Sequence, residues 1–394
     1  MISVEVLPST FPFERLEADW SRLYDGGRWE PSVSYGWVRA LLANHLAGRS
    51  NWFTVLVKRS SVVAGIVPMV LSERRLMGRR ITMLEPVQEK NNTHSDLLIA
   101  DHDPALLAAW LQALTDYRPA WDLLQISRLL EEGPLNTALA EPIRACGRAF
   151  RLKQQQPSYF LALPASYDDY LRARTGKFRS HLKRAEKKLA SSGEHDFVVV
   201  RGENGIEAAF GDLIEIEKDS WKHAHGTAIS SVTHQSGFYR DLAESASKAG
   251  TLHLTFLRLD GKAVAYNLGI IENGCYYYLK TSFRSAYAPL QVATVGRAWL
   301  IRQLIAEGLS HLDFPAEPYE WEKQWTGDLR WHRSLVLFNR TANAAVMRVV
   351  LRARELLRGS PGPREVVHSE ARALKGDLKG DLKRDPKGDP QGRR

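Results

Sequence analysis

Cysteine is scarce in this chain of 394 residues: there are two, Cys146 and Cys275, and neither stands in a CxxC or CxxH spacing. This excludes a disulfide scaffold and a cysteine-based zinc site, and it fits a reducing compartment. No apolar run reaches about 18 residues, the length that a membrane-spanning helix needs. The first twenty residues lack an apolar core segment, so we expect no signal peptide and a cytoplasmic protein.

Charge of one sign is also lacking over most of the chain. The net charge of +9 arises in two segments. Residues 172–188 hold eight Lys or Arg against Glu186 alone, and residues 359–394 hold nine against six acidic side chains. The remainder is nearly neutral. This disfavours a protein that binds nucleic acid over its whole surface and favours one anion-facing element.

The second basic segment begins at Gly359, where the composition changes. A four-residue repeat starts at Lys375-Gly-Asp-Leu and continues to Lys387-Gly-Asp-Pro, with almost no side chain to bury. We predict a disordered charged tail over 359–394. It is either a solvated tail or an electrostatic tether to lipid or RNA.

The chain contains an internal duplication at an offset of 201 residues. Both copies are expected to run helix, helix, strand, strand, and an Asp260-Gly261 pair between two β-rich runs is a strong hairpin signal. Low-identity matches of this kind also arise by chance, but the agreement of pattern favours two copies of one α/β unit. We predict a first domain at 1–155 and a second at 156–358. The matched pairs include Trp20 with Trp221, Gly36 with Gly237, Arg39 with Arg240, Thr54 with Thr255 and Ala64 with Ala265.

The elements expected in each copy follow from apolar periodicity and turn residues. In the first copy we expect strands at 52–59 and 62–70, a helix at 105–117 and a strand at 122–127. In the second we expect strands at 252–259, 263–271 and 276–283, a helix at 298–307, strands at 309–314 and 335–338, and a final helix at 345–358.

This order of elements resembles the GNAT acyltransferase superfamily, and one junction makes the resemblance specific. The segment from Gln291 to Arg297 is similar to the family's pyrophosphate loop, with Gly296 at the last motif position and Thr294 where the first glycine is expected. Small residues at a helix N-terminus let backbone N–H groups converge on a phosphate. The resemblance implies acetyl-CoA, or another acyl-CoA, bound by Gln291, Val292, Ala293, Thr294, Val295, Gly296 and Arg297. A plain helix N-cap is the alternative.

A longer stretch, about 158–338, is similar to the double-domain Fem-type and CelD-like branch of this superfamily. Its basic helix, its Trp221 and the Glu317-Pro-Tyr319 loop with Lys323 and Trp325 carry the resemblance. The implied fold is α/β (α+β GNAT-type): two tandem GNAT-like domains with mixed, mainly antiparallel sheets flanked by helices. The first domain lacks a phosphate loop and is expected to be degenerate.

The implied activity is N-acyl transfer to an amine acceptor, such as an amino sugar or another envelope or polysaccharide precursor. Such chemistry needs groups that move protons. The candidates are Tyr319, Glu322 and Lys323 in the polar loop, and Glu217 and His223 near a helix end. The spacing of Lys323 departs from the family pattern, and loop histidines such as His223 are commonly just solvated.

Further residues are expected to contact substrate. Each also has a purely structural interpretation: the basic helix presents a solvated face, the strand tyrosines pack in the core, and the polar segment 89–96 is an exposed turn. No HExxH-type spacing exists, so we expect no metal. The candidates are Arg179, Lys183, Trp221, Tyr277, Lys280, Trp325, His94 and Asp96.

Two other functions remain open. Aminoacyl-tRNA is an alternative donor, with the basic helix gripping its backbone, although no coiled-coil arm of the Fem type is evident. A non-catalytic GNAT-like partner in polysaccharide synthesis is the other. The sequence leaves the acceptor and the oligomeric state undetermined.

Overall fold

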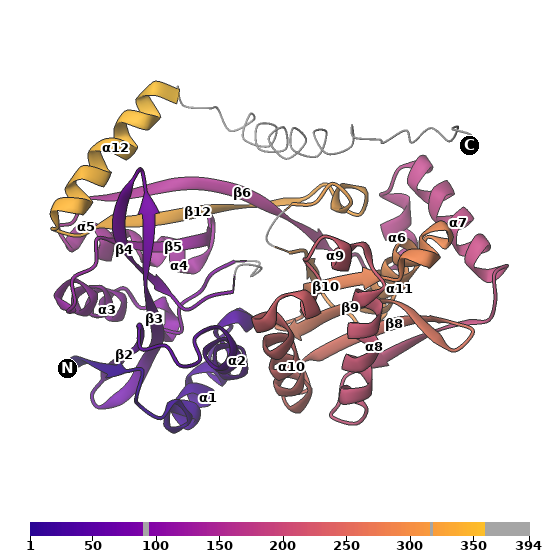
Figure 1. Ribbon diagram of the computed structural model, residues 1–394, viewed down its shortest axis with the longest axis horizontal. Helices are drawn as coiled ribbons and strands as arrows, with labels where there is room; N and C mark the ends of the chain where they lie inside the picture. Colours follow the sequence, from indigo (N-terminus) through magenta and orange to yellow (C-terminus); the bar gives the residue numbers. More distant parts are fainter. Residues whose placement is uncertain (90–93, 316–317, 359–394) are drawn as a thin grey trace, which may run out of the picture. The chain divides into compact units, whose positions relative to one another are not determined.

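The computed structural model describes residues 1–89, 94–315 and 318–358 (Figure 1). The predicted tail at 359–394, part of the polar segment at 89–96 and Glu317 lie outside these residues. Met1–Ala344 form one compact unit. The last helix, α12 (Ala342–Arg358), begins at the last residues of this unit.

The two copies have the same order of elements, as the duplication predicts, except for one short extra helix, α9, in the second. Those of the first copy are β1 (Ile2–Pro8), α1 (Glu17–Asp25), α2 (Tyr35–His45), β2 (Trp52–Arg59), β3 (Val62–Leu76), β4 (Arg79–Pro86), α3 (Pro104–Asp116) and β5 (Leu123–Leu130). Those of the second are β7 (His195–Val200), α8 (Ile206–Lys218), α9 (Trp221–Ala224), α10 (Thr233–Lys248), β8 (Leu252–Leu259), β9 (Lys262–Glu272), β10 (Cys275–Phe283), α11 (Val292–Ala306) and β11 (His311–Asp313).

The remaining elements connect the copies or follow them. Between β5 and β7 lie α4 (Pro134–Ala138), α5 (Ala140–Ala145), β6 (Phe150–Ala162), α6 (Tyr167–Arg172) and α7 (Gly176–Ala190), and β12 (Leu329–Phe338) follows β11. The sequence places the hairpin turns correctly: Ser60, Ser61, Asp260 and Gly261 all have positive φ. Helix α11 begins six residues before the predicted start at 298.

The strands form one sheet in the order β1-β2-β3-β4-β5-β12-β6-β11-β10-β9-β8-β7. Among the strands that the structure describes, only the β4–β5 and β10–β11 pairs are parallel. The sheet has a pseudo-twofold order: β1 to β5 run inward from one edge, and their counterparts β7 to β11 run inward from the other. The strand that follows each copy, β6 after the first and β12 after the second, is exchanged between them. Strand β6 pairs with β11 of the second copy, and β12 pairs with β5 of the first. These two long strands run side by side (Figure 1).

The helices of the second copy cover both faces of its strands. Helices α8 and α10 share a buried apolar cluster with β8 and β9, which Trp37 and Leu41 of α2 also join. On the opposite face, α11 packs with α7 and with the apolar side chains of β10 and β11. The mixed, mainly antiparallel α/β architecture is therefore as predicted. The domain boundary at 155/156 falls inside β6, and it stays a prediction.

Candidate functional site

The junction between β10 and α11 exposes an uncapped helix N-terminus. A short 3-10 turn at Ser285–Leu290 leads to Gln291, which has a left-handed backbone and makes no side-chain cap. The N–H groups of Thr294 and Val295 donate to the carbonyl of Gln291, at 2.9 and 3.1 Å. Those of Val292 and Ala293 come before this first helical bond, so they are directed out of the helix end.

The counterpart helix in the first copy has a closed end. Asp103 caps α3 and accepts hydrogen bonds from the N–H groups of Ala105, at 2.7 Å, and Leu106, at 3.2 Å. Its other oxygen pairs with Arg59 at 2.6 Å, and this bond lowers the pKa of Asp103. The carboxylate of Asp103 thus closes the N-terminus of α3, whereas the N-terminus of α11 has no side-chain cap.

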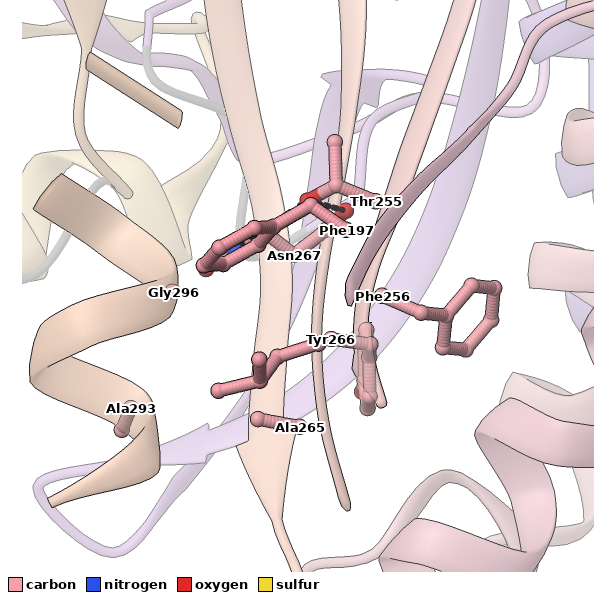
Figure 2. A pocket seen from close by; sticks show the side chains of 9 residues that line it. Phe197, Thr255, Phe256, Ala265, Tyr266, Asn267, Ala293 and Gly296 are labelled. Atoms are coloured by element: carbon pink, nitrogen blue, oxygen red, sulfur yellow. Dashed lines mark hydrogen bonds between the residues drawn. The ribbon is translucent and has the colours of Figure 1, made fainter. Parts of the chain in front are cut away.

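The other residues of the predicted phosphate loop lie on two sides of α11, one toward α7 and one toward the strands. Val292 and Val295 are buried against Ala185 and Leu189 of α7. Ala293 and Gly296 line a narrow hollow between α11 and strands β8 and β9, with no room for a water molecule. Figure 2 shows both residues on the helix, facing the strands.

The strand wall of this hollow is held by Asn267. Its side-chain nitrogen donates to Thr255 at 3.2 Å (Figure 2), and its oxygen accepts hydrogen bonds from Tyr278 and Thr281. A Cβ on Gly296 would lie 3.9 Å from this amide, so the position has room for alanine. Three strands are thereby linked under the helix N-terminus.

Strands β10 and β11 part at Asp313. Their parallel pairing ends at Tyr277 and Asp313. One oxygen of Asp313 pairs with Arg330 at 2.6 Å. The other, Oδ1, is buried and has no hydrogen-bond partner among the residues described. Burial raises the pKa of this carboxyl.

Side chains from the first copy meet Tyr277 near this point. Glu30 pairs with Nε2 of His94 at 2.5 Å and accepts a hydrogen bond from Tyr277 at 3.3 Å. Burial opposes the charged form of His94, but the carboxylate of Glu30 outweighs it and the pKa of His94 is raised. Asp96 instead bonds to His102, at 2.7 Å, within the first copy.

The polar loop after β11 contains one deeply buried carboxyl. Glu322 is fully buried, and one of its oxygens accepts the N–H of Tyr319 at 3.0 Å. Burial raises the pKa of Glu322 to about 8. Tyr319 is half exposed, and Lys323 is exposed and pairs with Glu320 at 2.7 Å.

Trp325 and Arg297 belong to the packing beneath this loop. Trp325 is fully buried against Phe178 of α7, and its carbonyl accepts a hydrogen bond from Tyr170 at 3.1 Å. The guanidinium of Arg297 lies 3.9 Å from the ring centroid of Trp321. These side chains hold the loop over α11.

The helix end near Glu217 is organised differently. Glu217 is fully buried, and both of its oxygens accept hydrogen bonds: Oε1 from Tyr266 at 2.6 Å and Lys222 at 3.1 Å, and Oε2 from the N–H of Ile229 at 2.5 Å. Trp221 and His223 are exposed nearby. The two predicted proton-transfer residues here thus differ in burial: Glu217 is buried and His223 is exposed.

The predicted basic helix is α7. Its apolar side packs inward through Phe178, Leu182, Ala185 and Leu189. Lys183 is exposed, and Arg179 donates to the carbonyl of Arg174 at 2.5 Å, so it caps the preceding helix. Ala185 and Leu189 share a buried cluster with Val292, so α7 packs beside the α11 N-terminus through its apolar face.

The sequence reasoning brought several of these residues into consideration but missed others. It did not single out Glu30, Asn267 or Asp313, which lack a local motif and acquire neighbours only through long-range pairing. Around Asp313 the sequence indicated only a short strand at 309–314. Among the residues described, no cluster of His, Cys, Asp or Glu is arranged to hold a metal ion. In the same residues, no helix combines the length and apolarity of a membrane span.

Comparisons with known proteins agree with this geometry. Residues 176–323 match the model of the acetyltransferase (GNAT) domain. A search of curated proteins finds no match. Among solved structures, FemX is similar with a TM-score of 0.55 at 11% identity, covering 88% of this chain and 99% of FemX. L-PGS from Bacillus licheniformis has a TM-score of 0.52 at 13% identity, covering 86% and 96%.

A third structure has the same fold. The C-terminal DUF2156 domain of a putative lysylphosphatidylglycerol synthetase from Agrobacterium fabrum gives a TM-score of 0.52 at 12% identity, covering 88% of this chain and 97% of that domain. At these identities the likeness concerns the fold. The chain therefore shares its fold with FemX, and its residues 176–323 belong to the acetyltransferase (GNAT) domain family.

Proposed function

We propose that the chain is an acyl-CoA-dependent N-acyltransferase, with acetyl-CoA as the first donor to test and the donor site in the second copy. The observation that carries this proposal is the contrast between the two counterpart helices. The N-terminus of α3 is filled by Asp103, and that of α11 has no side-chain cap. Backbone N–H groups and the helix dipole at such an end favour a diphosphate.

The surroundings of α11 support a ligand with several phosphates. Helix α7 packs against Val292 and keeps Lys183, Lys187 and Lys188 exposed. These side chains are available to a further phosphate of the donor. Ala293 and Thr294, in the first turn of α11, are partly exposed.

The reaction is attack of an amine nitrogen on the thioester carbonyl carbon. The carbon–sulfur bond breaks, the amine loses a proton and the leaving thiolate gains one. We place this exchange where β10 and β11 part. Because Glu322 has a pKa of about 8, its carboxyl holds a proton at neutral pH and is a candidate donor to the thiolate. The acceptor class, an amino sugar or envelope precursor, rests on the family resemblance.

The test is a thermal-shift titration of the full chain with acetyl-CoA, CoA and ATP in parallel. A ligand at 100 times its Kd raises the free energy of unfolding by about 2.7 kcal/mol when it binds only the folded state. We expect a clear rise in Tm with acetyl-CoA and CoA and little with ATP. No shift at millimolar CoA would remove the donor assignment.

A second candidate function uses aminoacyl-tRNA as donor, and the exposed basic face of α7 favours it. Neutralising the phosphates of a nucleic acid makes affinity fall steeply with salt. Binding of a total tRNA fraction would be measured between 50 and 200 mM NaCl by fluorescence anisotropy. A flat response, together with an acetyl-CoA shift, excludes this candidate.

A further inference from the structure

Lys280 lies at an irregular point of β10. The register between β9 and β10 shifts between Tyr278 and Lys280, which marks a β-bulge. The side chain is directed to the face that α10 covers, where its ammonium lies 5.2 Å from the ring centroid of Tyr239. This position is three residues along the strand from Tyr277, where β10 and β11 part.

The ammonium of Lys280 has no ion pair and no hydrogen bond within the part of the chain that the structure describes. The nearby carboxylates are already engaged. Glu217 accepts hydrogen bonds on both oxygens, and Glu89 lies 3.6 Å from His45. Lys222 adds a second positive charge, which is balanced by Glu217 and by the carbonyl of Thr281 at 2.6 Å.

Lys280 is only partly buried, and its nitrogen is not among the fully buried polar atoms, so a ligand can reach this unpaired cation. Burial and the charge of Lys222 lower the pKa of Lys280 to about 8, so it remains mostly charged at neutral pH. The ring of Tyr239 supplies only a weak attraction. A ligand with an anionic group would supply the missing acceptor.

We propose that Lys280 binds an anionic group of the acceptor, so that the substrate is an amine that also carries a carboxylate or a phosphate. This rests on the proposed acyl transfer. Next to the bulge, Lys280 lies on the α10 face of β10, three residues from Tyr277, where we place the reaction. A lysine ammonium is a point charge and takes either anion.

The experiment compares three small amines as probes of the full chain: β-alanine, O-phosphoethanolamine and uncharged ethanolamine. Release of CoA thiol from acetyl-CoA gives kcat/KM, and isothermal titration gives Kd for each amine. In the wild type we expect at least a tenfold preference for one acidic amine over ethanolamine. The acid that is preferred identifies carboxylate or phosphate as the recognised group.

The deciding variant is Lys280→Met, which keeps the length of the side chain and removes the charge. We expect it to lose the tenfold preference, with an unchanged acetyl-CoA thermal shift and no fall in Tm. Lys280→Gln provides a second variant if the first folds poorly. Lys248→Met, at the exposed end of α10, makes the same change in net charge and keeps the preference.

The possible failures are distinguishable. If acetyl-CoA produces no thermal shift, the proposed transfer fails, whereas the Kd values of the amines still report on Lys280. If the wild type shows no preference for an acidic amine, or if Lys280→Met retains it, the anion assignment is overturned. Absence of binding of both acidic amines at 50 mM overturns it as well.

Discussion

Asn44 of α2 lies directly over Gly237 of α10: a Cβ on Gly237 would come 1.9 Å from Oδ1 of Asn44. The counterparts of these two residues repeat the contact, since a Cβ on Gly36 would come 1.9 Å from Oγ of Ser245. Both pairs are related by the offset of 201 residues. Helices α2 and α10 therefore cross with a local twofold symmetry, and the glycines permit their close approach.

We expect Gly237→Ala to lower the free energy of unfolding by about 1–3 kcal/mol, because the added methyl overpacks the crossing. The control is Gly211→Ala in α8, where a Cβ meets nothing within 4 Å. That variant should be stabilised by about 0.5–1 kcal/mol, since alanine favours a helix. Urea unfolding measures both, and equal effects would contradict the crossing.

The second prediction concerns the end of α11. Ala293→Glu places a negative charge in the first helical turn, which the helix dipole favours by about 0.3–1 kcal/mol. The same charge repels a bound diphosphate. We therefore expect an unchanged or higher Tm for the free protein and at least tenfold weaker acetyl-CoA binding, measured by calorimetry.

The matched control for that variant is Ala105→Glu, at the same position in the counterpart helix α3. Because Asp103 already closes that helix end, acetyl-CoA affinity should not change. Equal loss of affinity in both variants would argue against a donor site at α11.

The third prediction concerns the buried carboxyl of Glu322. Its pKa of about 8 in the folded chain is above the usual value near 4.5. The unfolded state thus releases this proton at lower pH than the folded state does. The contribution of this protonated carboxyl to the free energy of unfolding is therefore fully present below pH 4.5. It is lost as pH rises toward 8, at up to about 1.4 kcal/mol per pH unit.

Glu322→Gln removes this titration and keeps the shape of the side chain. Relative to the wild type, the variant should gain stability steadily between pH 5 and pH 8. Urea midpoints at four pH values in that range give the difference. Parallel pH profiles of the two proteins would show that Glu322 ionises normally.

The fourth prediction concerns Glu217, whose oxygens are all engaged within the fold. Glu217→Ala leaves Lys222 without its partner and should cost about 3–5 kcal/mol. Glu217→Gln should cost less, because the amide retains an acceptor. Thermal unfolding and acetyl-transfer rates are measured together. Loss of turnover in Glu217→Gln at an unchanged Tm would instead indicate a catalytic role.

Local patterns predicted much of the fold. Alternating apolar residues identified β2 and β8 with their observed limits, and Asp260-Gly261 identified the turn between β8 and β9. The offset of 201 residues predicted two α/β copies. The start of α11 was misplaced because Gln291–Arg297 resembles a loop motif, whereas Val292–Arg297 already belong to the helix.

The candidate site was less accessible to sequence reasoning. Glu322 was predicted from its polar loop, but nothing in the sequence indicated that its carboxyl is fully buried. The approach of Glu30 to Tyr277 joins residues 247 positions apart. Such contacts follow from how the sheet is assembled, and no spacing in the sequence encodes them. The catalytic and binding residues stay predictions.

The exchange of β6 and β12 gives the molecule the connectivity of a strand-swapped dimer whose two protomers share one backbone. A cut in the segment between β6 and β7 would leave each fragment holding the strand that completes the other. Such fragments should recover a native-like sheet only when mixed, and each alone would present an unpaired edge prone to self-association. Neither copy can then fold independently, and a substitution that destabilises one copy also destabilises the other.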